Sequence, residues 1–262
     1  MSASRSFTLD KRLFNPDLYA RILKLWFQDL PSKATAPKQE QTARWFGVGA
    51  SETTRTAFDG QCRSSFESAL LSIGPDKLSL PGFTNVDADR KIYPDIASPF
   101  IGQFSGEDPN RENHEAALGL MVLLDQIPRN IFRKNQAVIY GHYDRISRAV
   151  FQEIYIRGLD KYQQFIHSPP WRVWFYMPLM HSESIQDHQM LSREFESLKS
   201  VAQMGRDGPA MEYVSAIIAI EKKHNDILLE FGRYPYRNEI LGRETTAEER
   251  QWLESGGDTF GS

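Results

Sequence analysis

Apolar residues recur at helical spacing along most of the chain. The first clear case follows Asn15-Pro16, where Asn can act as an N-cap and proline fits the first helical position. Leu18, Ile22 and Trp26 then fall on one stripe, as in an amphipathic helix. The same reading predicts helices over 39–46, 51–73, 136–157, 184–203 and 210–230, and a last helix opened by a capping box at 246–249. No segment shows strong strand alternation, so the pattern predicts an all-α fold.

The stretch 113–133 is the most apolar helix of the chain. Residues 116–124 are apolar on every side except at a single glycine, which is typical of a buried helix. We expect Pro128 to end this helix and to push Ile127 towards an extended conformation. Around Pro128 the end of this helix carries four polar residues: Asp125, Gln126, Arg129 and Asn130. Buried charges cost several kcal/mol unless they are paired or bind something, so this placement indicates a functional site.

Residues 75–112 interrupt the helical pattern with repeated prolines and scattered aromatic residues. We interpret this stretch as a long irregular insertion, either a functional lid or a simple excursion. The chain is then one helical domain over 15–254. We expect residues 1–14 and 255–262 to be flexible ends.

Composition limits the classes of function. The chain has 262 residues, a net charge of −3 and 40% hydrophobic residues, which is ordinary for a globular protein and gives no basic field for nucleic acid. The single Cys62 fits a reducing compartment, and no uncharged stretch approaches the roughly 20 residues of a membrane span. We therefore expect a cytoplasmic protein without a nucleic-acid or membrane partner.

A second polar patch is His181-Ser182-Glu183, directly behind a dense aromatic run. One interpretation is catalytic; the other is that Ser182 or Glu183 simply caps the next helix. On the helix over 210–230, Glu221 and His224 interrupt an apolar face. A lone histidine there is more often a satisfied core residue, but a facing carboxylate would orient the ring and raise its pKa.

A further patch lies just past the end of that helix, at Arg233, Arg237, Asn238 and Arg243. Arginines suit bidentate binding of carboxylate or phosphate. Nearby glutamates could also neutralise them and leave a solvated loop. Sequence spacing alone does not decide between these alternatives.

Together the patches predict general acid–base chemistry on an anionic substrate. A metal site would use His181, Glu183, His188 or His224, but no strong zinc spacing is present. No glycine-rich phosphate loop or nucleophile elbow occurs either, and Cys62 lies on an apolar helix face.

Three motifs also carry a resemblance to a known family: LLDQIPRNIFR at 123–133, MPLMHSES at 177–184 and FGRYPYRNEILGR at 231–243. In these the chain resembles the domain-of-unknown-function family 924, whose fold is all-α and similar to tetratricopeptide repeats. The resemblance implies a compact helical bundle with paired helices, but hardly any function. It implies a shared polar set of Asp125, Gln126, Arg129, Asn130, His181, Glu183, His224, Arg233, Arg237 and Asn238.

Two classes of function remain open. In the first, a hydrolase- or lyase-like enzyme binds a small anionic molecule through Gln126, Arg129, Asn130, Arg233, Arg237 and Asn238. Its proton carriers would be His181, Glu183, Asp125 and His224. No cofactor is evident, although Asp125 and Glu183 could bind Mg²⁺ in a diphosphate lyase. In the second, the chain is a protein-binding scaffold, but it lacks the internal repeat of about 34 residues expected of a solenoid. A homodimer is compatible with either class.

Overall fold

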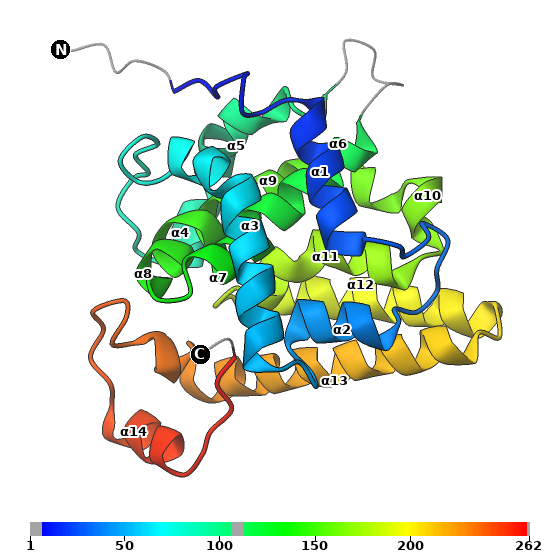
Figure 1. Cartoon of the computed structure of the whole chain (residues 1–262). Coiled ribbons are helices and arrows are strands. Elements are labelled where there is room, and N and C mark those ends of the chain that lie inside the picture. The colour runs from blue at the N-terminus through cyan, green and yellow to red at the C-terminus, as the bar shows by residue number, and fades with distance from the viewer. Residues whose placement is uncertain (1–6, 106–112, 261–262) are drawn as a thin grey trace.

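The computed structural model describes residues 7–105 and 113–260 of the chain. Within these two ranges every regular element is a helix and no β-strand occurs, which confirms the predicted all-α fold (Figure 1). The elements in chain order are α1 (Pro16–Phe27), α2 (Gln39–Phe46), α3 (Glu52–Ser72), α4 (Val86–Arg90), α5 (Tyr93–Ile101), α6 (His114–Met121), η2 (Val122–Gln126), α7 (Ile127–Ile131), α8 (Gln136–Val138), η3 (Ile139–Tyr143), α9 (Asp144–Ile156), η4 (Leu159–Lys161), α10 (Gln163–Ile166), α11 (Pro169–Met180), α12 (Ile185–Met204), α13 (Gly208–Phe231), η5 (Pro235–Arg237) and α14 (Ala247–Glu254). The segments η2 and η3 are π-helical, and η4 and η5 are 3₁₀ turns.

Most of the core is a large cluster of apolar side chains that extends from Leu9 to Ile217, and a smaller cluster contains Ile227, Leu228 and Tyr234. Helices α6 and α11 form the middle of the large cluster, and every residue of α11 is buried. The long helices α12 and α13 pack against each other along one side of the molecule (Figure 1). Helix α1 crosses α6 at Gly119, where an added Cβ would lie 3.1 Å from the Cβ of Tyr19. A side chain at this position would therefore require α1 to give by a few tenths of an ångström.

The central helix does not end at Pro128, and that prediction was wrong. Ile127 is helical, with φ −58° and ψ −36°, and its N–H bonds to the carbonyl of Val122 five residues earlier. The wide π turn lets Pro128 fall in the first turn of α7, where a missing N–H is tolerated. The chain therefore continues from α6 through η2 into α7, and Asp125 lies inside the helix rather than at its mouth.

The stretch 75–112 is more regular than its prolines predicted. It contains α4 and α5, and residues 106–112 lie outside the described part. Pro94 lies in the first turn of α5, which tolerates proline, while Ile96 and Phe100 are buried. Helix α5 packs closely against α9. The prediction assumed that each proline ends a helix, whereas Pro94 lies in the first turn of α5.

The expected flexible ends are partly packed. Leu9 and Phe14 belong to the main core, while residues 1–6 lie outside the described part. At the other end Phe260 stacks on His224 with a ring-centroid distance of 3.5 Å. Residues 261 and 262 also lie outside the described part. Apolar side chains in both end segments explain why they pack onto the fold.

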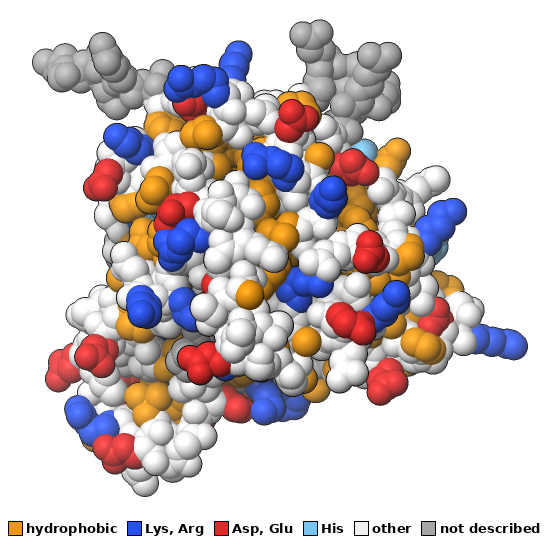
Figure 2. Space-filling view, in the orientation of Figure 1, with side chains coloured by type: hydrophobic (Ala, Val, Ile, Leu, Met, Phe, Trp, Pro, Cys, Tyr) orange, Lys and Arg blue, Asp and Glu red, His pale blue; other side chains and the backbone are white. Residues whose placement is uncertain are grey.

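Acidic and basic side chains are interspersed over the face shown in Figure 2. This distribution agrees with the small net charge of −3. Among the described residues, no helix combines the length and apolar character needed to cross a bilayer.

Candidate functional site

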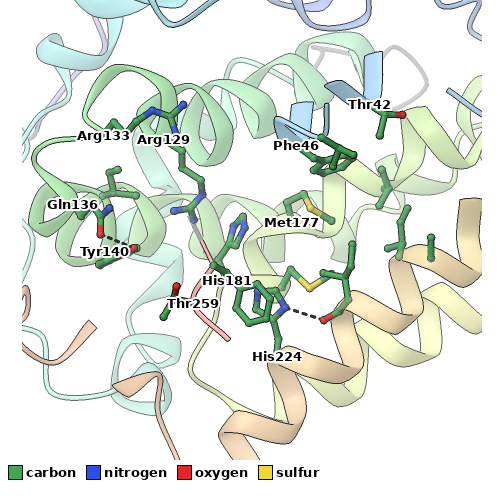
Figure 3. Close-up of a pocket in the computed structure, with 18 of the residues that line it drawn as sticks. Thr42, Phe46, Arg129, Arg133, Gln136, Tyr140, Met177, His181, His224 and Thr259 are labelled. Atoms are coloured by element: carbon green, nitrogen blue, oxygen red, sulfur yellow. Dashed lines mark hydrogen bonds between the residues drawn. The ribbon is translucent and has the colours of Figure 1, made fainter. Parts of the chain in front are cut away.

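A cavity of about 530 Å³ opens between α2, η3, α11 and α13. Figure 3 shows His181 in its middle, with Arg129 and Arg133 on one side and Phe46 and Met177 on the other. The lining residues are Thr42, Phe46, Val48, Arg129, Arg133, Gln136, Ile139, Tyr140, Val173, Met177, Met180, His181, Tyr213, Ala216, Ile217, Ile220, His224, Arg237, Thr259 and Phe260. This volume is within the usual range for a small-molecule site.

Asp125 and His181 form a hydrogen-bonded pair at this cavity. Asp125 comes from the π segment η2 and is 1% exposed, while His181 follows the last residue of α11. The distance from His181 Nδ1 to Asp125 Oδ1 is 3.0 Å. With the carboxylate ionised, Nδ1 must carry the proton, which leaves a lone pair on Nε2. In the described chain Nε2 has no hydrogen-bond partner, so it is available to a guest in the cavity.

The surroundings keep Asp125 ionised and His181 neutral. Burial alone would raise the pKa of Asp125, but the charge of Arg129 and the hydrogen bonds from His181 and Gln126 outweigh it and hold that pKa below its usual value. Gln126 donates to Oδ2 at 2.5 Å. Burial, helped by the charge of Arg129, lowers the pKa of His181 despite the attraction of Asp125. Near neutral pH the pair is therefore a carboxylate that orients a neutral imidazole, which is a base.

Arg129 bridges the carboxylates of Asp125 and Asp144. Its Nη2 lies 2.7 Å from Asp144 Oδ1 and 3.5 Å from Asp125 Oδ1. Its Nε is buried and has no hydrogen-bond partner. Arg129 therefore fixes Asp125 and still has an unused donor, and its side chain lines the cavity.

Arg237 is a buried cation held by aromatic rings. It is 4% exposed, and its guanidinium carbon lies 4.3 Å from the ring centroid of Tyr140 and 4.5 Å from that of Tyr234. Its Nη1 donates to the backbone carbonyl of His181 at 2.9 Å, while its Nε has no partner. Within the described ranges no carboxylate forms an ion pair with it. Burial would lower the pKa of Arg237, but Tyr236 and the nearby carboxylates of Glu183 and Asp144 outweigh this effect. A buried cation without a paired anion indicates a site where an anion binds.

His224 lines the cavity but differs chemically from His181. Its Nδ1 donates to the backbone carbonyl of Ile220 at 2.9 Å, and its ring packs under Phe260. Burial lowers the pKa of His224 to about 3, with the positive charges of the site contributing. It therefore stays neutral near pH 7, and no carboxylate of the described residues faces it to make it an acid.

Glu183 does not lie in the cavity, although it is two residues from His181. Both its oxygens accept from Arg243, at 2.7 and 2.9 Å, and Oε1 also accepts from the N–H of Tyr234 at 3.0 Å. These contacts lower the pKa of Glu183 in spite of burial. Its carboxylate connects the α11–α12 junction to the loop after α13, so it is a structural group.

Arg233 and Asn238 are also placed elsewhere. Arg233 pairs with Glu249 through two hydrogen bonds of 2.6 and 2.9 Å, and Asn238 donates to the same carboxylate at 3.0 Å. Glu249 belongs to the predicted capping box with Thr246, which the structure contains. This network holds α14 to the loop after α13, so the alternative of neutralising glutamates applies to Arg233.

Asn130 faces a neighbouring hollow rather than the main cavity. Its side chain donates to Asp59 at 2.8 Å, and Arg133 holds the same carboxylate at 3.0 Å through two nitrogens. Arg133 lines both hollows. Asn130 therefore supports the position of Arg133.

Several site residues were missed from the sequence. Tyr140 comes from the second π segment and packs on Arg237, and Asp144 anchors Arg129. Tyr213 lines the cavity with a buried hydroxyl that has no hydrogen-bond partner. A polar residue on an apolar helix face was the only available signal for Tyr213. The π segments leave no clear sequence pattern, although they are frequent at functional sites.

The lid interpretation of 75–112 finds no support in the described residues 75–105, since none of them lines the cavity. The cavity wall is completed instead by Thr259 and Phe260, near the C-terminal end.

The two carboxylates expected to bind Mg²⁺ do not share a site. Asp125 is enclosed by His181, Arg129 and Gln126, while Glu183 is fully used by Arg243 and Tyr234. No group of three potential metal ligands occurs over 7–105 and 113–260. Asp125 and Glu183 therefore do not form the shared oxygen site that was expected to hold Mg²⁺.

Comparisons with known proteins agree with the fold and give no activity. A family model described as "Bacterial protein of unknown function (DUF924)" matches residues 22–257. A solved structure of a protein of unknown function from Agrobacterium tumefaciens is 28% identical, with a TM-score of 0.54, over 94% of this chain and 100% of that chain. No curated protein matches. The family match covers most of the chain, including all three motifs, and the chain therefore belongs to the DUF924 family.

Proposed function

We propose that this protein is an enzyme that performs acid–base chemistry on a small anionic substrate in the cavity between α11 and α13. His181 is the base, Asp125 orients it, and Arg237 with Arg129 binds the anion. One observation carries the proposal: the Asp125–His181 pair presents a free Nε2 to the same cavity that contains a buried, unpaired Arg237. Packing alone would favour an apolar residue at either place.

The proposed chemistry begins when Nε2 of His181 takes a proton. In a hydrolysis the proton comes from water, whose oxygen then attacks the substrate; in an elimination it comes from a substrate carbon. The imidazolium that forms is stabilised by the Asp125 carboxylate and returns its proton to the leaving group. Both reaction classes use the same residues, and the fixed cations would stabilise negative charge that develops during the reaction.

The alternative of a protein-binding scaffold accounts for part of the polar set. Glu183, Arg233 and Asn238 form networks that hold loops to helices, as a scaffold would need. It gives no reason for an unpaired guanidinium beside an oriented imidazole in a cavity. The enzyme is therefore the function that the geometry supports better.

The test is a screen of carboxylate and phosphate esters and of hydroxy acids, with three forms of the full chain. His181→Ala should lower turnover by about 10²-fold or more, the usual size of a general-base contribution. It should lower the melting temperature by a few degrees, because buried Asp125 loses one hydrogen-bond donor, and should leave ligand-induced stabilisation nearly unchanged. His167→Ala is the matched control, since His167 is exposed and outside the cavity. Equal turnover by His181→Ala, or a collapse of the fold without any ligand binding to the unaltered protein, would reject the proposal.

A further inference from the structure

The cavity has two chemically different ends. The basic end contains Arg129, Arg133 and Arg237, with Tyr140 packed on the last of these. The other end is apolar and is lined mainly by Phe46, Val48, Val173, Met177, Ile217 and Ile220. In Figure 3 His181 lies between the labelled basic residues and Phe46 with Met177. A small inorganic anion would occupy only the first of these ends.

The apolar end is open rather than filled by core side chains. Phe46, Val48 and Ile220 are 44%, 63% and 43% exposed, which is unusual for large apolar residues that lie together around one cavity. Exposed apolar surface of this kind commonly marks a ligand site. Met177 adds a flexible side chain that can adapt to different shapes. Water is a poor occupant of this end because few polar groups line it.

We propose that the substrate is an amphiphile, an organic anion with an apolar hydrocarbon tail. Its carboxylate or phosphate head binds at Arg237 and Arg129, and its tail lies along Phe46, Met177 and Ile217. This inference rests on the proposed function and adds the substrate class. Because His181 lies between the two ends, the bond acted on is at the junction of head and tail.

The experiment measures the affinity of the full chain for two series, straight-chain carboxylates and alkyl phosphates, by calorimetry below their micelle concentrations. Burial of each methylene should tighten binding by about fourfold until the apolar end is full. Comparing the two series at equal tail length identifies the preferred head. Inorganic phosphate should bind weakly and should compete with both.

Two matched substitutions locate the tail. Ala216 lines the cavity and Ala219 does not, and both are exposed on α13. Ala216→Phe should abolish the dependence on tail length by filling the apolar end, whereas Ala219→Phe should keep it. Arg237→Gln should weaken every ligand by a similar factor. If that variant does not fold, displacement of the tailed ligand by phosphate in the unaltered protein gives the same information.

The outcomes separate this inference from the proposed function. Affinity that is independent of tail length but is lost with Arg237 would overturn the amphiphile and leave the anion site intact. Affinity that rises with tail length but is unaffected by Arg237→Gln and by phosphate would instead contradict the anion site. If Ala216→Phe and Ala219→Phe change the dependence of affinity on tail length equally, the tail does not bind at the proposed apolar end.

Discussion

At the scale of single residues, the site depends on two histidines kept neutral for different purposes. His181 is oriented by Asp125 and keeps an open nitrogen, whereas His224 is closed by the carbonyl of Ile220 and the ring of Phe260. Both pKa values are lowered, first of all by burial. The first is therefore suited to chemistry, and the second links folding stability to pH.

His224 gives a prediction about stability. Its pKa is about 3 in the folded protein and about 6.5 when unfolded, so between these values only the unfolded state takes up a proton. The stability it contributes is fully present above pH 6.5 and is lost as the pH falls. His224→Gln removes this linkage. Between pH 6.5 and 5 the unaltered protein should lose about 1–2 kcal/mol more unfolding free energy than the variant.

Urea unfolding of both proteins at the two pH values measures this difference. His167→Gln is the control, because it makes the same substitution at an exposed histidine outside the cavity. Identical pH dependence in the unaltered protein and His224→Gln would show that His224 is not buried as described.

The sequence predicted which polar residues lie near the site better than it predicted the direction of their side chains. Asp125 and His181 were predicted to share a site and lie 3.0 Å apart. Glu183 was assigned the same role but turns to Arg243. Two residues of separation at a helix junction do not reveal side-chain direction, because the chain changes course there. The partner carboxylates of Arg233 and Asn238 were visible in the sequence, but their pairing depends on tertiary contact.

At the scale of elements, hydrophobic spacing was sufficient for the long helices. The predicted helix over 39–46 agrees with α2, and that over 51–73 agrees with α3 to within a residue. Prolines were misread at Pro94 and Pro128, and at Pro99, which lies inside α5. Pro94 and Pro128 lie in the first turn of a helix, where the proline ring is tolerated. The π segments η2 and η3 contain Asp125 and Tyr140 of the site. Hydrophobic spacing did not distinguish these segments from ordinary α-helix.

Glu183 supplies a prediction at this scale. Glu183→Ala would leave the guanidinium of Arg243 and the N–H of Tyr234 without their acceptor, at a cost of about 1–3 kcal/mol. The melting temperature should fall by several degrees for a chain of this length. Affinity for an anionic cavity ligand should not fall, because Glu183 does not line the cavity and its negative charge opposes an anion at Arg237. Glu212→Ala, at an exposed position of α13, is the control and should change neither quantity.

Calorimetric melting and ligand titration test whether Glu183→Ala affects stability without weakening ligand binding. A Glu183→Ala protein that melts normally but loses ligand binding or turnover would return Glu183 to the catalytic set.

At the scale of the whole molecule, distant segments meet in one cavity. The base comes from the end of α11, its carboxylate from η2, the buried cation from η5, and the apolar wall from α2, α11 and α13. The three sequence motifs each contribute one of the first three groups. Their convergence follows from the fold, in which α6 and α11 are central and the chain after α13 returns to the end of α11 through Arg237 (Figure 1).

The most direct test of this account is the reactivity of His181 towards diethyl pyrocarbonate, which acylates neutral imidazoles and is mapped by mass spectrometry. We predict that His181 is modified at neutral pH and that a medium-chain alkyl carboxylate or phosphate protects it. Exposed His167 should be modified equally with or without that ligand. His181 that stays unmodified at neutral pH, or that reacts at the same rate with saturating ligand present, would contradict an open base in a ligand cavity.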